Sequence, residues 1–155
     1  MDLTWKNYLG ELSNIKGLEN FASEDPLYSF SIAKGSKKDV LVIVHHEMLS
    51  GMHARYGGEK ERRIYTGIET IIAGNSQTEI FYSQIQPEDI PIGRCGHLFP
   101  FPSEVNNVFV AGYHGNSYVA GQVEFLLNNG YMQIVQVEKL IFGKPRFEKR
   151  TIILR

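Results

Sequence analysis

The chain has 155 residues, of which 43% are hydrophobic and 21% are charged. This length suits a single domain over residues 1–155, and the apolar fraction excludes a predominantly disordered chain. Sixteen basic and seventeen acidic side chains leave a formal charge of −1, so no overall field attracts nucleic acid or anionic lipid.

The start of the chain lacks the features of a secretory signal, because it is acidic at Asp2 and no apolar stretch follows. The longest uninterrupted apolar run, residues 40–44, is far shorter than the about 20 residues that a membrane-spanning helix needs. A single cysteine, Cys95, cannot form an internal disulfide, which fits a reducing compartment. We therefore expect no membrane partner, and a location in the cytoplasm or within an assembled particle.

The first predicted element is a short amphipathic helix over about 4–16. Apolar residues such as Trp5, Leu9 and Leu12 recur there at spacings of three and four. Thr4 is the expected N-cap of this helix, and Gly17 is the expected stop.

After Pro26 the apolar period changes to two, which predicts β-strands. The first two strands are expected over 28–33 and 39–47. A loop rich in glycine, histidine and charge follows over 48–62. Strands 64–73 and 78–85 are then predicted to form a hairpin, because both are rich in Ile, Thr, Tyr and Phe.

Residues 86–107 contain four of the six prolines, so this segment is predicted to be an ordered crossing loop. Four further strands are expected over 108–113, 118–127, 131–142 and 146–154. Turn residues separate these strands at 114–117, 128–130 and 143–145.

The pattern amounts to about eight strands with short connections and no alternation of strands with helices. Short connections favour antiparallel pairing. We therefore predict a mainly β fold, an antiparallel β-sandwich or partly closed barrel with one short N-terminal helix. Exposed edge strands of such a sheet would allow copies of the chain to pair into a homo-oligomer.

Two bends, residues 45–63 and the turn at 113–118, are expected to form the functional site. Rigid aromatic rings beside adaptable polar residues are typical of recognition surfaces. A tyrosine ring can stack on the C–H face of a sugar, while Asn and His bond its hydroxyl groups. The sequence therefore predicts a non-enzymatic module that binds a glycan or a protein surface. The expected binding residues are His53, Tyr56, Tyr113, His114, Asn116 and Tyr118.

The alternative is a small metal-independent hydrolase, specifically a ribonuclease, and nucleic acid is a partner only in this interpretation. Such chemistry needs a general base, a general acid and a cation. The residues that could supply these groups are His46, His53, Arg62, Arg63 and His114. The charges over 59–63 largely neutralise one another, which weakens attraction of phosphate and favours the binding module over the enzyme.

No metal or cofactor is predicted. His45, His46 and Glu47 are residue types that bind zinc, but neighbouring residues of a strand point to opposite faces. Two interpretations of Cys95 stay open. Arg94 and His97 would favour a reactive thiolate, whereas a catalytic thiol also needs a histidine held against the sulfur.

Overall fold

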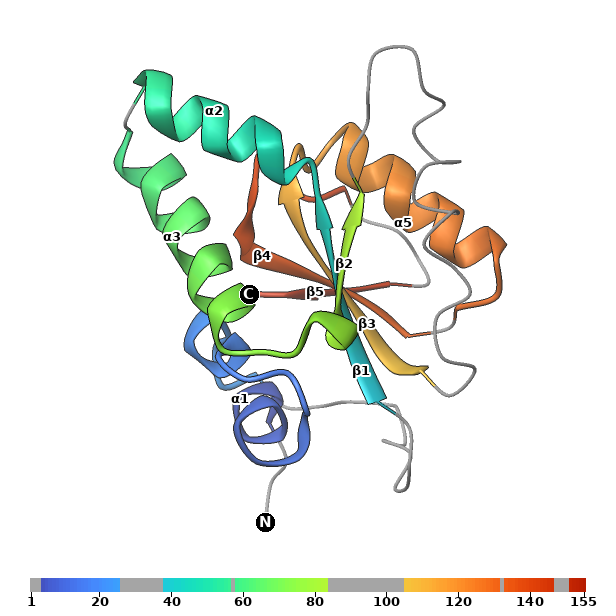
Figure 1. Ribbon diagram of the computed structural model, residues 1–155. Helices are drawn as coiled ribbons and strands as arrows, with labels where there is room; N and C mark the ends of the chain where they lie inside the picture. The colour runs from blue at the N-terminus through green and yellow to red at the C-terminus, as the bar shows by residue number, and fades with distance from the viewer. Residues whose placement is uncertain (1–3, 26–37, 57, 84–104, 132, 147–150) are drawn as a thin grey trace.

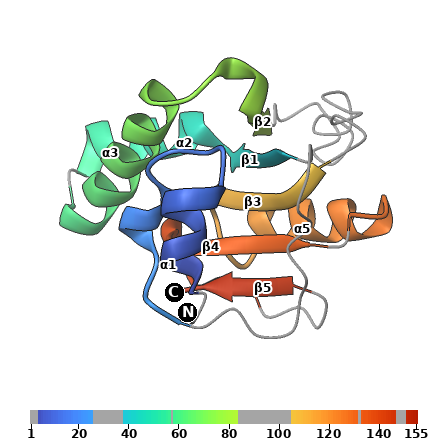
Figure 2. The same ribbon diagram turned by 90° about the horizontal axis from the view of Figure 1, so that it is seen from below.

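The centre of the fold is a parallel β-sheet. The computed structural model describes residues 4–25, 38–56, 58–83, 105–131, 133–146 and 151–155. Within them the strands form a five-stranded sheet in the order β2-β1-β3-β4-β5, and each neighbouring pair is parallel (Figure 2). The strands are β1 (Lys38–Val44), β2 (Ile80–Ser83), β3 (Val105–Tyr113), β4 (Ile134–Phe142) and β5 (Thr151–Leu154).

Helices make the crossings that parallel strands require. Helices α2 (His46–Tyr56) and α3 (Glu59–Ala73) follow β1, and a short 3₁₀ turn, η3 (Gln77–Glu79), leads into β2. Helix α5 (Tyr118–Asn128) joins β3 to β4. The two crossings run in opposite directions along the sheet, so right-handed connections place α3 and α5 on opposite faces (Figure 1).

Each face of the sheet has its own apolar core. On one face the buried isoleucines of α3 (Ile64, Ile68 and Ile71) pack with Leu41, Ile43 and Phe109. On the other face Val119, Val123 and Leu126 of α5 pack with Val40, Val42 and Val110. The central strands are therefore buried on both sides, which explains the unbroken apolar run at 40–44.

The N-terminal segment packs on the α3 side of the sheet. It consists of α1 (Trp5–Asn7), a π-helical turn η1 (Tyr8–Leu12) and a 3₁₀ turn η2 (Leu18–Phe21). The predicted N-cap is confirmed, because the Asn7 N–H donates to Thr4 Oγ1 at 3.1 Å. The helix is shorter than the predicted 4–16, since Ser13 already has an extended backbone.

A buried carboxylate fixes this segment to the amino end of the sheet. Asp39, at the start of β1, accepts hydrogen bonds from the hydroxyl groups of Tyr8 and Ser13 and from the Asn107 backbone and side chain. All four residues are nearly inaccessible to solvent. Burial, and next the charge of Asp39, raises the pKa of the Tyr8 hydroxyl well above its usual value. The hydroxyl group therefore stays a hydrogen-bond donor over the whole physiological range.

The predicted antiparallel sandwich or barrel is wrong, because the described sheet is parallel and two of its expected strands are helices. Segments 64–73 and 118–127 lie in α3 and α5. Their Ile, Thr, Val and Tyr residues favour strands only weakly and yield to tertiary packing. The spacing Ile64, Ile68, Ile71 places one side of a helix against the sheet, and Val119, Val123, Leu126 repeats it.

The predicted turns and loop are also reassigned. The expected loop 48–62 is mostly helical, within α2 and the start of α3. The glycine and asparagine residues at 74–77 and 128–130 end helices and do not close hairpins. Gly130, for example, follows α5 with φ of 86° and donates its N–H to the Leu127 carbonyl at 3.2 Å.

Several predicted strands are confirmed as strands. The predictions at 39–47, 108–113 and 131–142 overlap β1, β3 and β4, and 78–85 contains β2. The end of 146–154 is β5. The expected strand 28–33, most of the proline-rich loop and Cys95 lie outside the described residues. In the part of the chain that is described, no helix combines the length and apolar character needed to cross a bilayer.

Candidate functional site

The strand order reverses between β1 and β3. From β1 the chain crosses over one face to β2, and from β3 it crosses over the other face to β4. In doubly wound sheets, ligands bind outside the carboxyl ends of the strands at such a reversal. The two segments that leave this point begin with His45 after β1 and His114 after β3.

His45 occupies an unusual position at the carboxyl end of β1. It is buried, with 4% of its surface exposed, and its backbone is left-handed with φ of 53°. Such a conformation is unfavourable for a residue other than glycine and is found disproportionately at functional sites. The His45 N–H donates to the Ser83 carbonyl at 2.8 Å, which joins the ends of β1 and β2.

The His45 imidazole is held at one nitrogen and unsatisfied at the other. Nδ1 contacts the Glu47 carboxylate, whereas Nε2 is buried and has no hydrogen-bond partner among the described residues. The ring meets the edge of Tyr118 with a centroid separation of 4.3 Å. A carboxylate on one imidazole nitrogen fixes the orientation of the ring.

An aromatic cluster, Tyr113, His114, Tyr118 and Phe142, lies beside His45. Tyr113 stacks between Tyr118 and Phe142, at centroid distances of 6.2 and 5.5 Å. The His114 ring packs edge-on against Phe142 at 5.8 Å. Tyr118 is 41% exposed, so the cluster presents an accessible ring above the buried imidazole.

Glycines allow the chain segments of this site to approach closely. At Gly143, with φ of 88°, a Cβ would lie 2.5 Å from His114 Nε2. At Gly112, with φ of 119°, a Cβ would lie 2.1 Å from the Val44 carbonyl oxygen of β1. Both positions therefore require glycine, for backbone conformation as well as for space.

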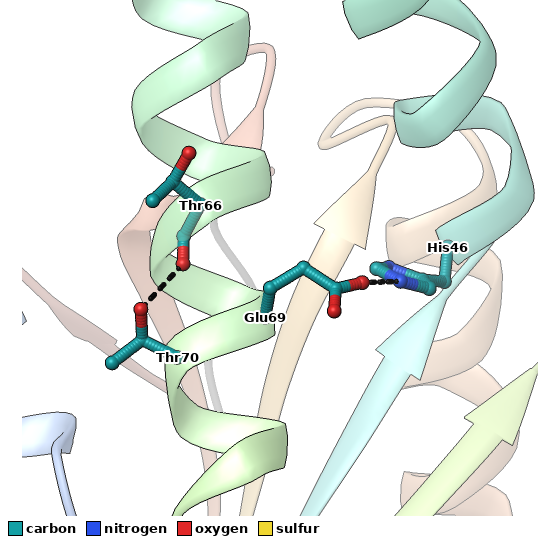
Figure 3. Close-up of polar contacts among 4 residues, drawn as sticks. All are labelled: His46, Thr66, Glu69 and Thr70. Carbon is teal, nitrogen blue, oxygen red and sulfur yellow. Dashed lines mark hydrogen bonds and ion pairs between the residues drawn. The ribbon is translucent and has the colours of Figure 1, made fainter.

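His46, the next residue, contacts α3 and the end of β2. Its Nε2 is 2.6 Å from Glu69 Oε1 of α3 (Figure 3). Its ring stacks on Tyr65 with a centroid separation of 5.6 Å. The neighbouring Thr70 instead bonds back to the Thr66 carbonyl within α3. Burial, and secondarily the Glu69 charge, raises the pKa of the nearby Tyr82 hydroxyl. His46 Nδ1, like His45 Nε2, is buried and unpartnered in the described residues.

Polar groups without partners concentrate at the carboxyl ends of β1 and β2. Seven buried side-chain atoms of the described residues lack a hydrogen bond, and three of them belong to His45, His46 and Ser83 at the ends of β1 and β2. Buried polar groups are normally satisfied, so an edge that holds several unsatisfied ones is where a bound molecule would complete them.

The structure brings together part of the predicted binding set. Tyr113, His114 and Tyr118 share the aromatic cluster, and the exposed Asn116 donates its N–H to His114 Nδ1 at 3.3 Å. His53 and Tyr56 belong to α2, and their side chains lie outside the described part of the chain.

The predicted hydrolase set is spread over different elements. Arg62 and Arg63 are exposed on α3, His46 contacts α3, and His114 contacts Phe142 of β4. No ring contact or hydrogen bond joins His46 to His114 in the described residues. Within the same residues, no group of three His, Cys, Asp or Glu side chains is arranged as metal ligands would be.

Sequence reasoning missed the buried position of His45 at the end of β1 and the packing of Phe142 in the aromatic cluster. The available signal for His45 was its position directly after an apolar run buried on both faces, where a parallel strand ends. Comparisons with protein-family models, curated proteins and solved structures found no match for this chain, so its site stands on geometry alone.

Proposed function

We propose that the protein is a non-enzymatic binding module and that its ligand is a glycan, bound by the aromatic cluster at the carboxyl ends of β1 and β3. The position at the reversal of strand order supports a ligand site. Tyr118, with Tyr113 stacked against it, supplies a ring face for the C–H surface of a sugar, and His114 and Asn116 supply polar groups.

The observation that carries this proposal is the buried His45 Nε2 without a partner, directly beside the exposed ring of Tyr118. A sugar hydroxyl both donates and accepts, so it satisfies this nitrogen in either imidazole tautomer. An apolar partner would leave the nitrogen unpaired. The combination of an exposed ring with a hidden polar atom therefore favours a hydroxyl-rich ligand.

The test is binding of the full chain to a glycan array, followed by calorimetric titration of the glycan with the strongest signal. We expect Tyr118→Ala to weaken binding about tenfold, through loss of stacking area. Leu12→Ala is the matched control, because Leu12 is another exposed apolar residue, 62% accessible, in the N-terminal turn η1. Absence of any glycan binding by the wild type, or equal losses in both variants, would show the proposal to be wrong.

A second candidate is a metal-independent ribonuclease, supported by the two imidazoles that carboxylates hold at one nitrogen, His45 by Glu47 and His46 by Glu69. This arrangement is the one that orients a general base. If it operates, the chain cleaves an RNA oligonucleotide in the presence of EDTA and leaves the matching DNA intact. His45→Asn should then lower the rate at least about 100-fold, and asparagine tolerates the left-handed backbone. Wild-type protein that leaves the RNA uncut excludes this candidate.

A further inference from the structure

A hollow separate from the aromatic cluster lies between α3 and β4. Its volume is 340 Å³, within the range of small-molecule sites. The lining residues are Phe21, Lys60, Arg63, Ile64, Glu138, Lys139 and Ile141. From these residues we propose a binding site for a small amphiphilic anion, a molecule with an apolar body and a carboxylate or phosphate head.

The apolar wall is formed by side chains that belong to the body of the fold. Ile64 is almost fully buried, at 3% exposure, and Phe21 is partly buried, and both belong to the core on the α3 face. Ile141 also lines the hollow, but its side chain packs in the core on the α5 face. Gly67 of α3 makes room for this wall, because a Cβ there would lie 2.8 Å from the Phe21 ring. The wall is therefore a fixed apolar surface that would receive the body of a ligand.

An irregularity in β4 shapes the opposite side of the hollow. The pairing of β3 with β4 passes from Val110↔Gln136 to Gly112↔Ile141, so β4 contributes more residues than β3 over this stretch. The additional residues include Glu138 and Lys139, which line the hollow opposite α3. Such bulges re-aim side chains and are common beside functional sites.

The charges around the hollow do not cancel. Three cations, Lys60, Arg63 and Lys139, face a single carboxylate, that of Glu138. The ion pairs between described residues lie elsewhere, and none includes these three cations. An anionic head group would supply the missing charge, and Arg63 suits it particularly because a guanidinium binds carboxylate or phosphate through two parallel hydrogen bonds.

The size of the hollow selects a small ligand. Apolar walls beside unpaired cations match a molecule that carries both parts, whereas inorganic phosphate has no apolar body and an alcohol has no charge. This site uses other residues than the proposed glycan site, so either proposal can fail without the other.

The experiment is titration of the isotope-labelled full chain, followed by amide chemical shifts in two-dimensional NMR spectra. The probes are octanoate, octyl phosphate, 1-octanol and inorganic phosphate at equal concentrations. We expect saturable shifts at 60–64 and 138–141 with octanoate, octyl phosphate or both, and no saturation with the other two probes. The tighter of the two amphiphiles identifies the preferred head group. Shifts centred elsewhere, or octanol binding as tightly as octanoate, would overturn the proposal.

Arg63→Glu should weaken octanoate or octyl phosphate binding about tenfold, through loss of a charge-assisted contact. Arg62→Glu is the matched control, because Arg62 is the neighbouring exposed arginine, does not line the hollow and changes the net charge equally. Lys139→Glu provides a second variant on β4, with the same expected loss, and the spectrum of each variant verifies its fold. Equal weakening by Arg62→Glu and Arg63→Glu would reveal unspecific charge attraction and refute the site.

Discussion

Replacement of Asp39 by alanine should lower the free energy of unfolding by about 3–5 kcal/mol, because buried donors lose their shared acceptor. The hydroxyl groups of Tyr8 and Ser13 and the Asn107 side chain all bond this carboxylate, and water cannot replace it at a site with 1% exposure. Urea unfolding followed by the fluorescence of Trp5, the only tryptophan, measures the change.

Asp39→Asn is the matched variant for this prediction. It keeps the size of the side chain and one acceptor oxygen but removes the charge, so we expect a smaller loss than for Asp39→Ala. If the free energies of unfolding of both variants lie within about 0.5 kcal/mol of the wild-type value, the carboxylate does not anchor the N-terminal segment.

The second large effect is expected at Gly112, where β3 passes β1. A Cβ there would meet the backbone of Val44 at 2.1 Å, and backbone atoms cannot rotate away as a side chain can. The φ of 119° adds conformational strain for any other residue. We expect Gly112→Ala to cost about 3–6 kcal/mol, the sum of strain and overpacking.

Gly121→Ala tests whether this cost is specific to the close approach. Gly121 lies within α5, and a Cβ there would meet nothing within 4 Å. Alanine should therefore stabilise the protein by up to about 1 kcal/mol through its helix propensity. Thermal unfolding of the two variants measures both effects. Similar stability of the two alanine variants would contradict the close packing of β1 against β3.

The sequence is informative about strands and less so about how they connect. The central strands are recognisable because their apolar residues are concentrated, as in the run ending at Val44. Helix α3 is difficult to recognise in the sequence, because its isoleucines and threonines have strand propensity. Only the spacing of Ile64, Ile68 and Ile71 indicates a helix. Once α3 and α5 are read as strands, every connection becomes short and an antiparallel sheet follows.

The candidate site also has a part that the sequence predicts and a part that it does not. Tyr113 and Tyr118 are close in sequence, so local reasoning places them together. The role of His45 depends on contacts with α5, a helix that approaches it only through the tertiary fold. The burial of His45 Nε2 and its lack of a hydrogen-bond partner are properties of the tertiary structure, and no local pattern of residues encodes them.

The junction of β1 and α2 has a mechanical consequence. His45 and His46 are consecutive, yet one ring meets Tyr118 of α5 and the other pairs with Glu69 of α3. One peptide bond thus connects a residue that packs on α5 to a residue that pairs with α3. A shift of the backbone at the end of β1 would therefore change contacts with α5 and with α3 together.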